Sequence, residues 1–131
     1  MDRGRTPAAL VLALLLAACG GPAVAPGAGT VRELSEAQAV AELPSRVIID
    51  VRTPAETADG MLAGALNIDF QAPDFRERIG QLDRDASYLL YCRTGNRSAQ
   101  AAAVMAELGF ADVVDAGGFA ELVAAGAPVD P

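Results

Sequence analysis

The sequence SYLLYCRTGNRSAQAAAVMAEL at residues 87–108 carries the clearest signal of the fold. Residues 87–91 form an apolar, strand-like run, and the polar segment 92–98 follows directly. An alanine-rich helical pattern occupies residues 97–108 and stops at Gly109. This order predicts a buried strand that leads through a short turn into a covering helix.

The turn carries Cys92, the residue with the clearest chemical implication. A cysteine between a strand and the start of a helix lies beside backbone N–H groups that lack helical partners. These groups and the positive end of the helix dipole favour an anion and lower the pKa of a thiol held there. Cys92 is therefore predicted to be a reactive thiolate.

The remainder of the chain alternates between strand-like and helix-like segments. Helices are expected at 34–43, in a turn after Pro54, at 75–82 and at 119–125. Ser35 and Gln38 have the spacing of a capping box at the start of the first helix. Strands are expected at 47–51, 65–68 and 111–114. A turn at Gly117 and Gly118 is expected to close the last strand. The alternation predicts an α/β fold with a mainly parallel sheet and helices on both faces, in which ligands bind beyond the carboxyl ends of the strands. Cys92 stands at such an end.

The N-terminal region has the pattern of a secretory signal. Arg3 and Arg5 precede an uncharged run at 8–18, which is shorter than the roughly 20 residues of a membrane-spanning helix. The tetrapeptide LAAC at 16–19 resembles the lipobox of bacterial lipoproteins. That resemblance implies that residues 1–18 are a signal peptide and that Cys19 becomes a lipidated N-terminus; an ordinary cleaved signal peptide is the alternative.

The segment after Cys19 predicts how the folded domain is joined to the expected lipid anchor. Residues 20–30 contain mainly glycine, proline and alanine, which predicts a flexible tether before a single domain at 31–131. The expected location is the extracytoplasmic, periplasmic side of a bacterial cell envelope. Contact with the membrane is expected through the lipid anchor only.

Composition excludes several functions. The chain has a formal net charge of −7 and no lysine, which argues against nucleic acid as a partner. It has no histidine, which excludes hydrolases with a histidine base and histidine-ligated metal sites. Its only cysteines are Cys19 and Cys92, so a Cys-x-x-Cys redox pair is excluded. No metal and no cofactor are expected.

Three motifs occur in a recognisable order: IDVRTP at 49–54 with Glu56 and the segment GALNI at 64–68, CRTGNRS at 92–98, and DAGGF at 115–119. Together they resemble a single-domain rhodanese, a thiosulfate sulfurtransferase, over residues 31–122. The resemblance implies a rhodanese-like fold with a five-stranded, mainly parallel sheet. It also implies an edge strand at 31–34, which the local pattern does not indicate.

The resemblance implies a catalytic Cys92 that takes up a sulfane sulfur as a persulfide. The loop expected to bind the donor consists of Arg93, Thr94, Gly95, Asn96 and Arg97. Its backbone N–H groups would cradle the terminal sulfur or an oxyanion, and Gly95 suits the turn because glycine tolerates positive φ. Supporting roles fall to Asp50, Arg52 and Ser98. Whether Arg93 or Arg97 contacts the donor is open.

The expected donor is a small anion such as thiosulfate, or a persulfide, and the expected acceptor is cyanide, a small thiol, sulfite or a protein thiol. A cysteine phosphatase is a weaker alternative, because Cys92 and Arg97 enclose four residues where the related phosphatases have five. The other alternative is a domain that binds a partner or senses sulfur or oxidant without turnover.

Overall fold

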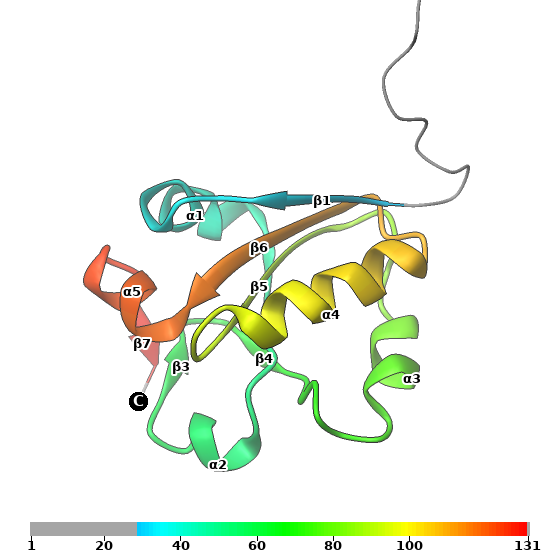
Figure 1. Cartoon of the computed structure of the whole chain (residues 1–131). Helices are drawn as coiled ribbons and strands as arrows, with labels where there is room; N and C mark the ends of the chain where they lie inside the picture. Colours follow the sequence, from blue (N-terminus) through cyan, green and yellow to red (C-terminus); the bar gives the residue numbers. More distant parts are fainter. Residues whose placement is uncertain (1–28, 131) are drawn as a thin grey trace, which may run out of the picture.

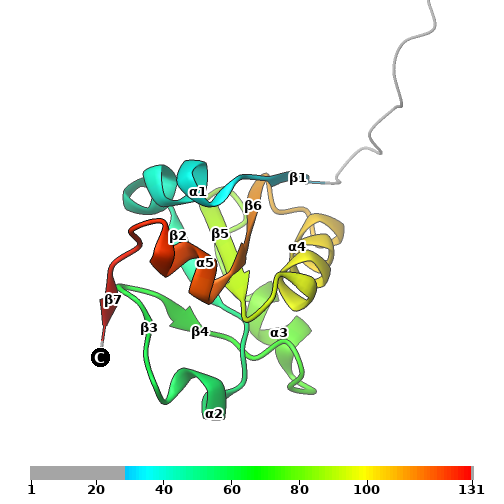
Figure 2. The same cartoon turned by 60° about the vertical axis from the view of Figure 1, so that its left-hand side comes forward.

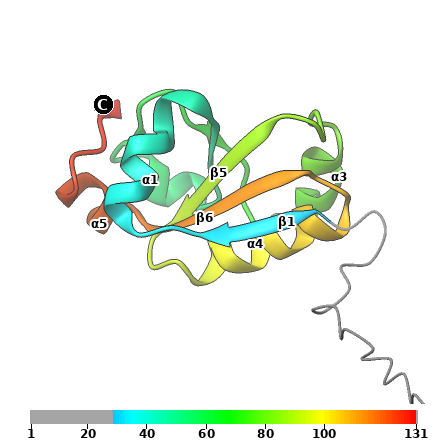
Figure 3. The same ribbon diagram turned by 90° about the horizontal axis from the view of Figure 1, so that it is seen from above.

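A five-stranded sheet forms the centre of the fold (Figure 1). The computed structural model describes residues 29–130; the expected signal peptide, Cys19 and the tether as far as residue 28 lie outside the described residues. The strands follow the order β1-β6-β5-β2-β4, and every pair in this sheet is parallel. Figure 3 shows β1, β6 and β5 side by side in that order.

The chain passes through the following elements: β1 (Thr30–Glu33), α1 (Glu36–Glu42), the 3₁₀ turn η1 (Leu43–Ser45), β2 (Val47–Asp50), α2 (Pro54–Thr57), β3 (Met61–Leu62), β4 (Leu66–Asn67), α3 (Phe75–Gly80), β5 (Ser87–Cys92), α4 (Asn96–Glu107), β6 (Asp112–Gly118), α5 (Phe119–Ala124) and β7 (Val129–Asp130).

The two faces of the sheet carry separate apolar cores because side chains alternate along each strand. In β5, Leu90 points into a core that α3 and α4 cover, while its neighbour Leu89 points into a core that α1 and α5 cover. Both residues are fully buried. Figure 2 shows the two pairs of helices on opposite sides of the sheet. The predicted α/β fold with helices on both faces is therefore confirmed.

The details of the fold agree with the expectations in part. The edge strand implied by the resemblance is present as β1, which begins at Thr30. The turn expected at Gly117 and Gly118 is wrong, because β6 continues through both glycines and Gly118 still pairs with Cys92 after a register shift. No local pattern predicts the antiparallel pair of β3 and β7. None of the helices in residues 29–130 has the length and apolar character needed to cross a bilayer.

Candidate active site

The carboxyl ends of three parallel strands meet at one edge of the sheet. Asp50 at the end of β2 pairs with Tyr91 of β5, and Cys92 at the end of β5 pairs with Gly118 at the end of β6. The segments that follow these strands therefore lie together, although they are far apart in the sequence. Residues 92–98, named here the Cys92 loop, form the centre of this edge.

The sulfur of Cys92 is surrounded by hydrogen-bond donors. The Gly95 N–H donates to Cys92 Sγ at 2.9 Å. Burial would raise the pKa of the Cys92 thiol, but hydrogen bonds from the backbone N–H and hydroxyl of Ser98 and from the N–H groups of Thr94 and Gly95 outweigh it, so the pKa lies below its ordinary value. Cys92 itself is fully buried.

The Cys92 loop can adopt this curvature because Gly95 has φ +95°, a backbone conformation that L side chains rarely adopt. Gly95 is the N-cap of α4, and the Ser98 N–H in the first turn of this helix is one of the groups that lower the pKa of Cys92. A Cβ atom at Gly95 would lie 3.3 Å from Gly117 Cα, which leaves little room between the loop and β6. Both conformation and space favour glycine here.

Arg97, the last arginine of the loop, is bound by a carboxylate. Its Nη1 and Nη2 atoms donate to Glu56 Oε2 and Oε1, each at 2.7 Å. Glu56 also accepts from the N–H and hydroxyl of Thr53, both at 3.0 Å, as part of a capping box that starts α2. These contacts, led by the Arg97 hydrogen bond, lower the pKa of Glu56 to about 2.

The two residues predicted to support the loop form a buried ion pair. Arg52 Nη2 lies 2.7 Å from Asp50 Oδ2, and Arg52 Nε donates to both carboxylate oxygens at 3.0 Å. Arg52 Nη2 also donates to the Gly60 carbonyl at 2.8 Å. Asn67 Nδ2 donates to the backbone carbonyls of Asp50 and Arg52. The pair therefore connects β2 to the chain that leads into β3 and β4.

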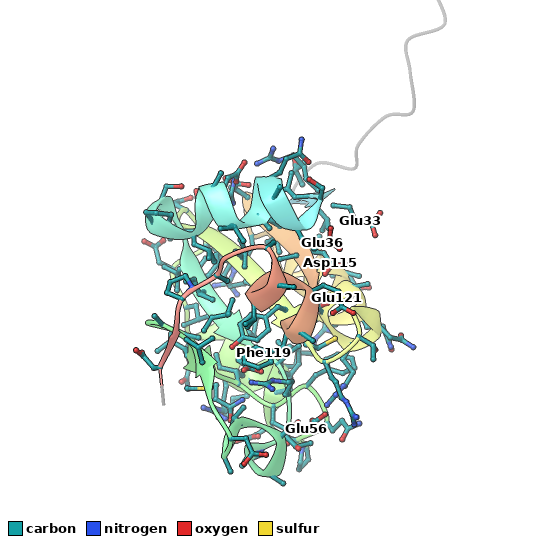
Figure 4. All side chains as sticks on the ribbon, turned by 90° about the vertical axis from the view of Figure 1, so that its left-hand side faces the viewer. Glu33, Glu36, Glu56, Asp115, Phe119 and Glu121 are labelled. Atoms are coloured by element: carbon teal, nitrogen blue, oxygen red, sulfur yellow. The ribbon has the colours of Figure 1, made fainter. Side chains whose placement is uncertain are left out.

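A pocket of about 540 Å³ opens beside the Cys92 loop. Its lining residues come from the chain around α2, from the Cys92 loop and from the start of α5, and they are Arg52, Ala55, Glu56, Asp59, Arg93, Phe119 and Ala120. The guanidinium carbon of Arg52 lies 4.2 Å from the ring centroid of Phe119, within cation–π distance. Figure 4 shows Phe119 and Glu56 on the same face of the molecule.

The remaining loop residues differ in exposure. Arg93 and Thr94 are exposed, and Arg93 contributes to the pocket wall. Asn96 is also exposed, and its Oδ1 accepts a hydrogen bond from Gln100 Nε2 at 2.9 Å. Ser98 is fully buried, and its hydroxyl donates to Asp115 Oδ1 at 2.7 Å. The structure thus brings all predicted loop residues to one place but gives them different surroundings.

Sequence reasoning assigned no role to three residues of this site. Glu56 binds Arg97, Phe119 covers Arg52, and Asp115 binds Ser98. All three belong to the motifs of the resemblance, which was the only signal that pointed to them. Within residues 29–130, no group of three or more histidine, cysteine or carboxylate side chains is placed to hold a metal ion.

Comparison with known proteins gives consistent matches. A family model described as the rhodanese-like domain matches residues 29–125. A sulfurtransferase of Allochromatium vinosum is 33% identical over 81 residues, which cover 62% of this chain and 74% of the relative. Thiosulfate sulfurtransferase PspE of Escherichia coli is 33% identical over 76 residues, covering 56% of this chain and 71% of the relative. The crystal structure of a rhodanese-related protein from Thermoplasma volcanium has a TM-score of 0.66 at 32% identity and covers 76% of this chain and 97% of that one.

Proposed function

We propose a sulfur-transfer reaction for this chain, which belongs to the rhodanese-like domain family. In this reaction the chain takes a sulfane sulfur from thiosulfate or a persulfide donor onto Cys92 and passes it to a thiophilic acceptor. Its relatives include proteins named as sulfurtransferases. The observation that carries the proposal is the closure of the Cys92 loop around the sulfur, in which the Gly95 N–H donates to Cys92 Sγ at 2.9 Å. The backbone N–H groups of Thr94 and Ser98 also lower the pKa of this thiol. Such N–H groups stabilise a thiolate without a base or a metal.

The proposed reaction has two steps. In the first, the Cys92 thiolate attacks the outer sulfur of thiosulfate, the sulfur–sulfur bond of the donor breaks, and sulfite leaves with the bonding electrons. Cys92 then carries a persulfide whose terminal sulfur is anionic. In the second, an acceptor such as cyanide or a thiolate attacks this terminal sulfur, the new sulfur–sulfur bond breaks, and the Cys92 thiolate returns.

The free positive charge at the pocket supports an anionic donor. Arg97 is held by Glu56 and Arg52 by Asp50, whereas Arg93 forms no ion pair within residues 29–130. Arg93 is exposed at the pocket wall next to Cys92. We therefore assign to Arg93 the attraction of a dianion such as thiosulfate.

The engagement of Arg97 also favours sulfur over phosphate. A phosphatase of related fold would need its loop arginine to bind the phosphoryl oxygens. Here both terminal nitrogens of that arginine already donate to Glu56. The loop of four residues between Cys92 and Arg97 agrees with this assignment.

The proposed location rests on residues outside the described part of the chain. The arginines at 3 and 5, the apolar run at 8–18 and LAAC at 16–19 support a lipid-anchored protein on the periplasmic side of a bacterial envelope. Two or more acyl chains on Cys19 would hold it stably at the membrane. A Cys19→Ser chain that stays in the membrane fraction would contradict this anchor.

A steady-state assay with thiosulfate as donor and cyanide as acceptor tests the proposed reaction. Thiocyanate should form with the wild-type chain, and Cys92→Ser should abolish its formation, because the hydroxyl of serine is not ionised at neutral pH. Turnover retained by a folded Cys92→Ser chain would overturn the mechanism.

A further inference from the structure

Asp59 is a charged residue of the pocket wall to which the reaction described above assigns no role. It lines the pocket beside the Cys92 loop, and it is exposed. Among residues 29–130 its carboxylate forms no ion pair. The charge of Asp59 is therefore available to a molecule that enters the pocket.

The backbone holds Asp59 at this wall. The next residue, Gly60, donates its N–H to the Thr57 carbonyl at 3.0 Å. The Gly60 carbonyl accepts from Arg52 Nη2 at 2.8 Å, and Arg52 is in turn fixed by its ion pair with Asp50. The chain at Asp59 is thus anchored to the end of α2 and to the buried pair, while its side chain stays exposed.

Four charged side chains line the pocket: Arg52, Glu56, Asp59 and Arg93. Two of them are already neutralised, because Arg52 is paired with Asp50 and Glu56 with Arg97. Asp59 and Arg93 face the same pocket, yet in the described part of the chain they form no ion pair with each other or with any other residue. The pocket therefore offers one free negative and one free positive charge.

The pocket is also larger than thiosulfate or cyanide requires. Thiosulfate has five non-hydrogen atoms, and at roughly 30 Å³ each, the share of a water molecule in the liquid, it would fill about 150 Å³. The pocket has about 540 Å³, which lies in the range typical of sites for organic molecules. Phe119, Ala55 and Ala120 supply apolar wall for the carbon atoms of such a molecule.

We propose that the sulfur acceptor is a small organic thiol with a protonated amino group and a carboxylate, and that Asp59 is the residue that selects the amino group. Asp59 would bind the ammonium group, and Arg93 would bind the carboxylate once sulfite has left the pocket. The inference rests on the proposed function, because it names the acceptor of the same reaction.

The chemical step is the second half of that reaction with this acceptor. The acceptor thiol loses its proton to solvent, and its thiolate attacks the terminal sulfur of the Cys92 persulfide. A sulfur–sulfur bond forms to the acceptor, the bond between the two sulfurs on Cys92 breaks, and Cys92 leaves as a thiolate with the bonding electrons. The product is the persulfide of the acceptor, and no oxidant or reductant is consumed. Two charge contacts would hold the acceptor in place for this attack.

The test follows this step by itself. Cys92 is loaded with sulfur from thiosulfate, the donor is removed by gel filtration, and the loss of about 32 Da on addition of a thiol is followed by intact mass spectrometry. Four thiols of similar size differ in charge: free cysteine carries both groups, cysteamine only the amino group, mercaptopropionate only the carboxylate, and mercaptoethanol neither. Each variant is compared with wild type for the same thiol, so the intrinsic reactivity of that thiol cancels.

The expected pattern distinguishes the two charges. Asp59→Asn should lower the rate about fivefold with free cysteine and with cysteamine, the effect of losing one partly exposed ion pair, and should leave the rate with mercaptoethanol unchanged. Arg93→Gln should lower the rates with free cysteine and mercaptopropionate but not with cysteamine. An equal loss with mercaptoethanol in Asp59→Asn, or no loss with the two amino thiols, would overturn the proposal.

Two further chains control for charge. Asp85→Asn removes an exposed carboxylate that precedes β5 and so lies at the opposite end of that strand from Cys92; it should leave all four rates unchanged. Asp59→Glu keeps the charge and should keep the preference for amino thiols. If Asp85→Asn lost as much as Asp59→Asn, or if Asp59→Glu did, recognition by the Asp59 charge would be refuted.

The proposed function and the acceptor assignment fail in different ways. A wild-type chain that takes up no sulfur from thiosulfate would contradict the proposed function, and the acceptor assignment with it. A chain that loads normally and then transfers sulfur to the amino thiols equally fast with and without the Asp59 charge would contradict the acceptor assignment alone.

Discussion

Arg97 and Glu56 form a bidentate ion pair in which each terminal nitrogen of the guanidinium lies 2.7 Å from a different carboxylate oxygen. The two residues are 41 positions apart in the sequence. The pair joins the N-terminal end of α4 to α2 and thereby fixes one end of the Cys92 loop. It also removes Arg97 from the set of free cations at the pocket.

Breaking this pair should destabilise the chain. The two side chains are 18% and 25% exposed, so solvent screens the attraction only in part. Glu56→Gln and Arg97→Ala are each expected to lower the free energy of unfolding by about 1 kcal/mol, and the double variant by less than the sum. Urea unfolding measures all three; strictly additive losses would show that the two residues do not interact.

The same pair gives a pH dependence with a defined sign. Folding lowers the pKa of Glu56 from 4.5 to about 2, so on acidification the unfolded chain binds the proton first. The stability from this group is fully present above pH 4.5 and is lost as the pH falls toward 2. The difference in unfolding free energy between wild type and Glu56→Gln should shrink over this window, and a difference that grows would contradict the assignment.

Arg93 should control the affinity for an anionic donor. Loss of one charge-assisted contact is expected to reduce kcat/KM for thiosulfate about tenfold in Arg93→Gln, equivalent to about 1.4 kcal/mol. Arg76→Gln, which removes the same charge from an exposed position on α3, is the matched control. Equal losses in the two chains would show that only net charge matters.

Gly95 should be required by the shape of the loop. Gly95→Ala places a side chain at φ +95° and against Gly117, whereas Gly64→Ala meets similar strain at φ +77° with no neighbouring atom within 4 Å. Each is expected to cost about 1 kcal/mol of stability from the left-handed backbone. Only Gly95→Ala should also lower the rate of sulfur transfer; an equal effect of Gly64→Ala on the rate would refute the role of the loop geometry.

The sequence predicts the buried strands and the position of Cys92 well because their signals are local. The apolar run of β5, the polar turn and the alanine-rich α4 follow one another without interruption, so the position of Cys92 at a sheet edge could be inferred. The edge strand β1 could not be inferred from pattern, because all four of its residues are exposed and show no alternation. The pairing of β3 with β7 has no local signal, since each strand has two residues.

The contacts that organise the site could not be predicted for a related reason. Arg97 and Glu56 come from different helices, and their contact depends on how the chain after β2 returns to the sheet edge. Ser98 and Asp115 are 17 positions apart and meet only because α4 packs against β6. The sequence supplies these residue types, but only the tertiary packing decides which of them become partners.

Intact mass spectrometry of the chain after incubation with thiosulfate, beside a Cys92→Ser control, shows directly whether Cys92 takes up a sulfur atom. The wild-type chain should gain about 32 Da, one sulfur atom, which cyanide removes and which the control never acquires. No gain in the wild-type chain, or an equal gain in Cys92→Ser, would contradict a persulfide on Cys92.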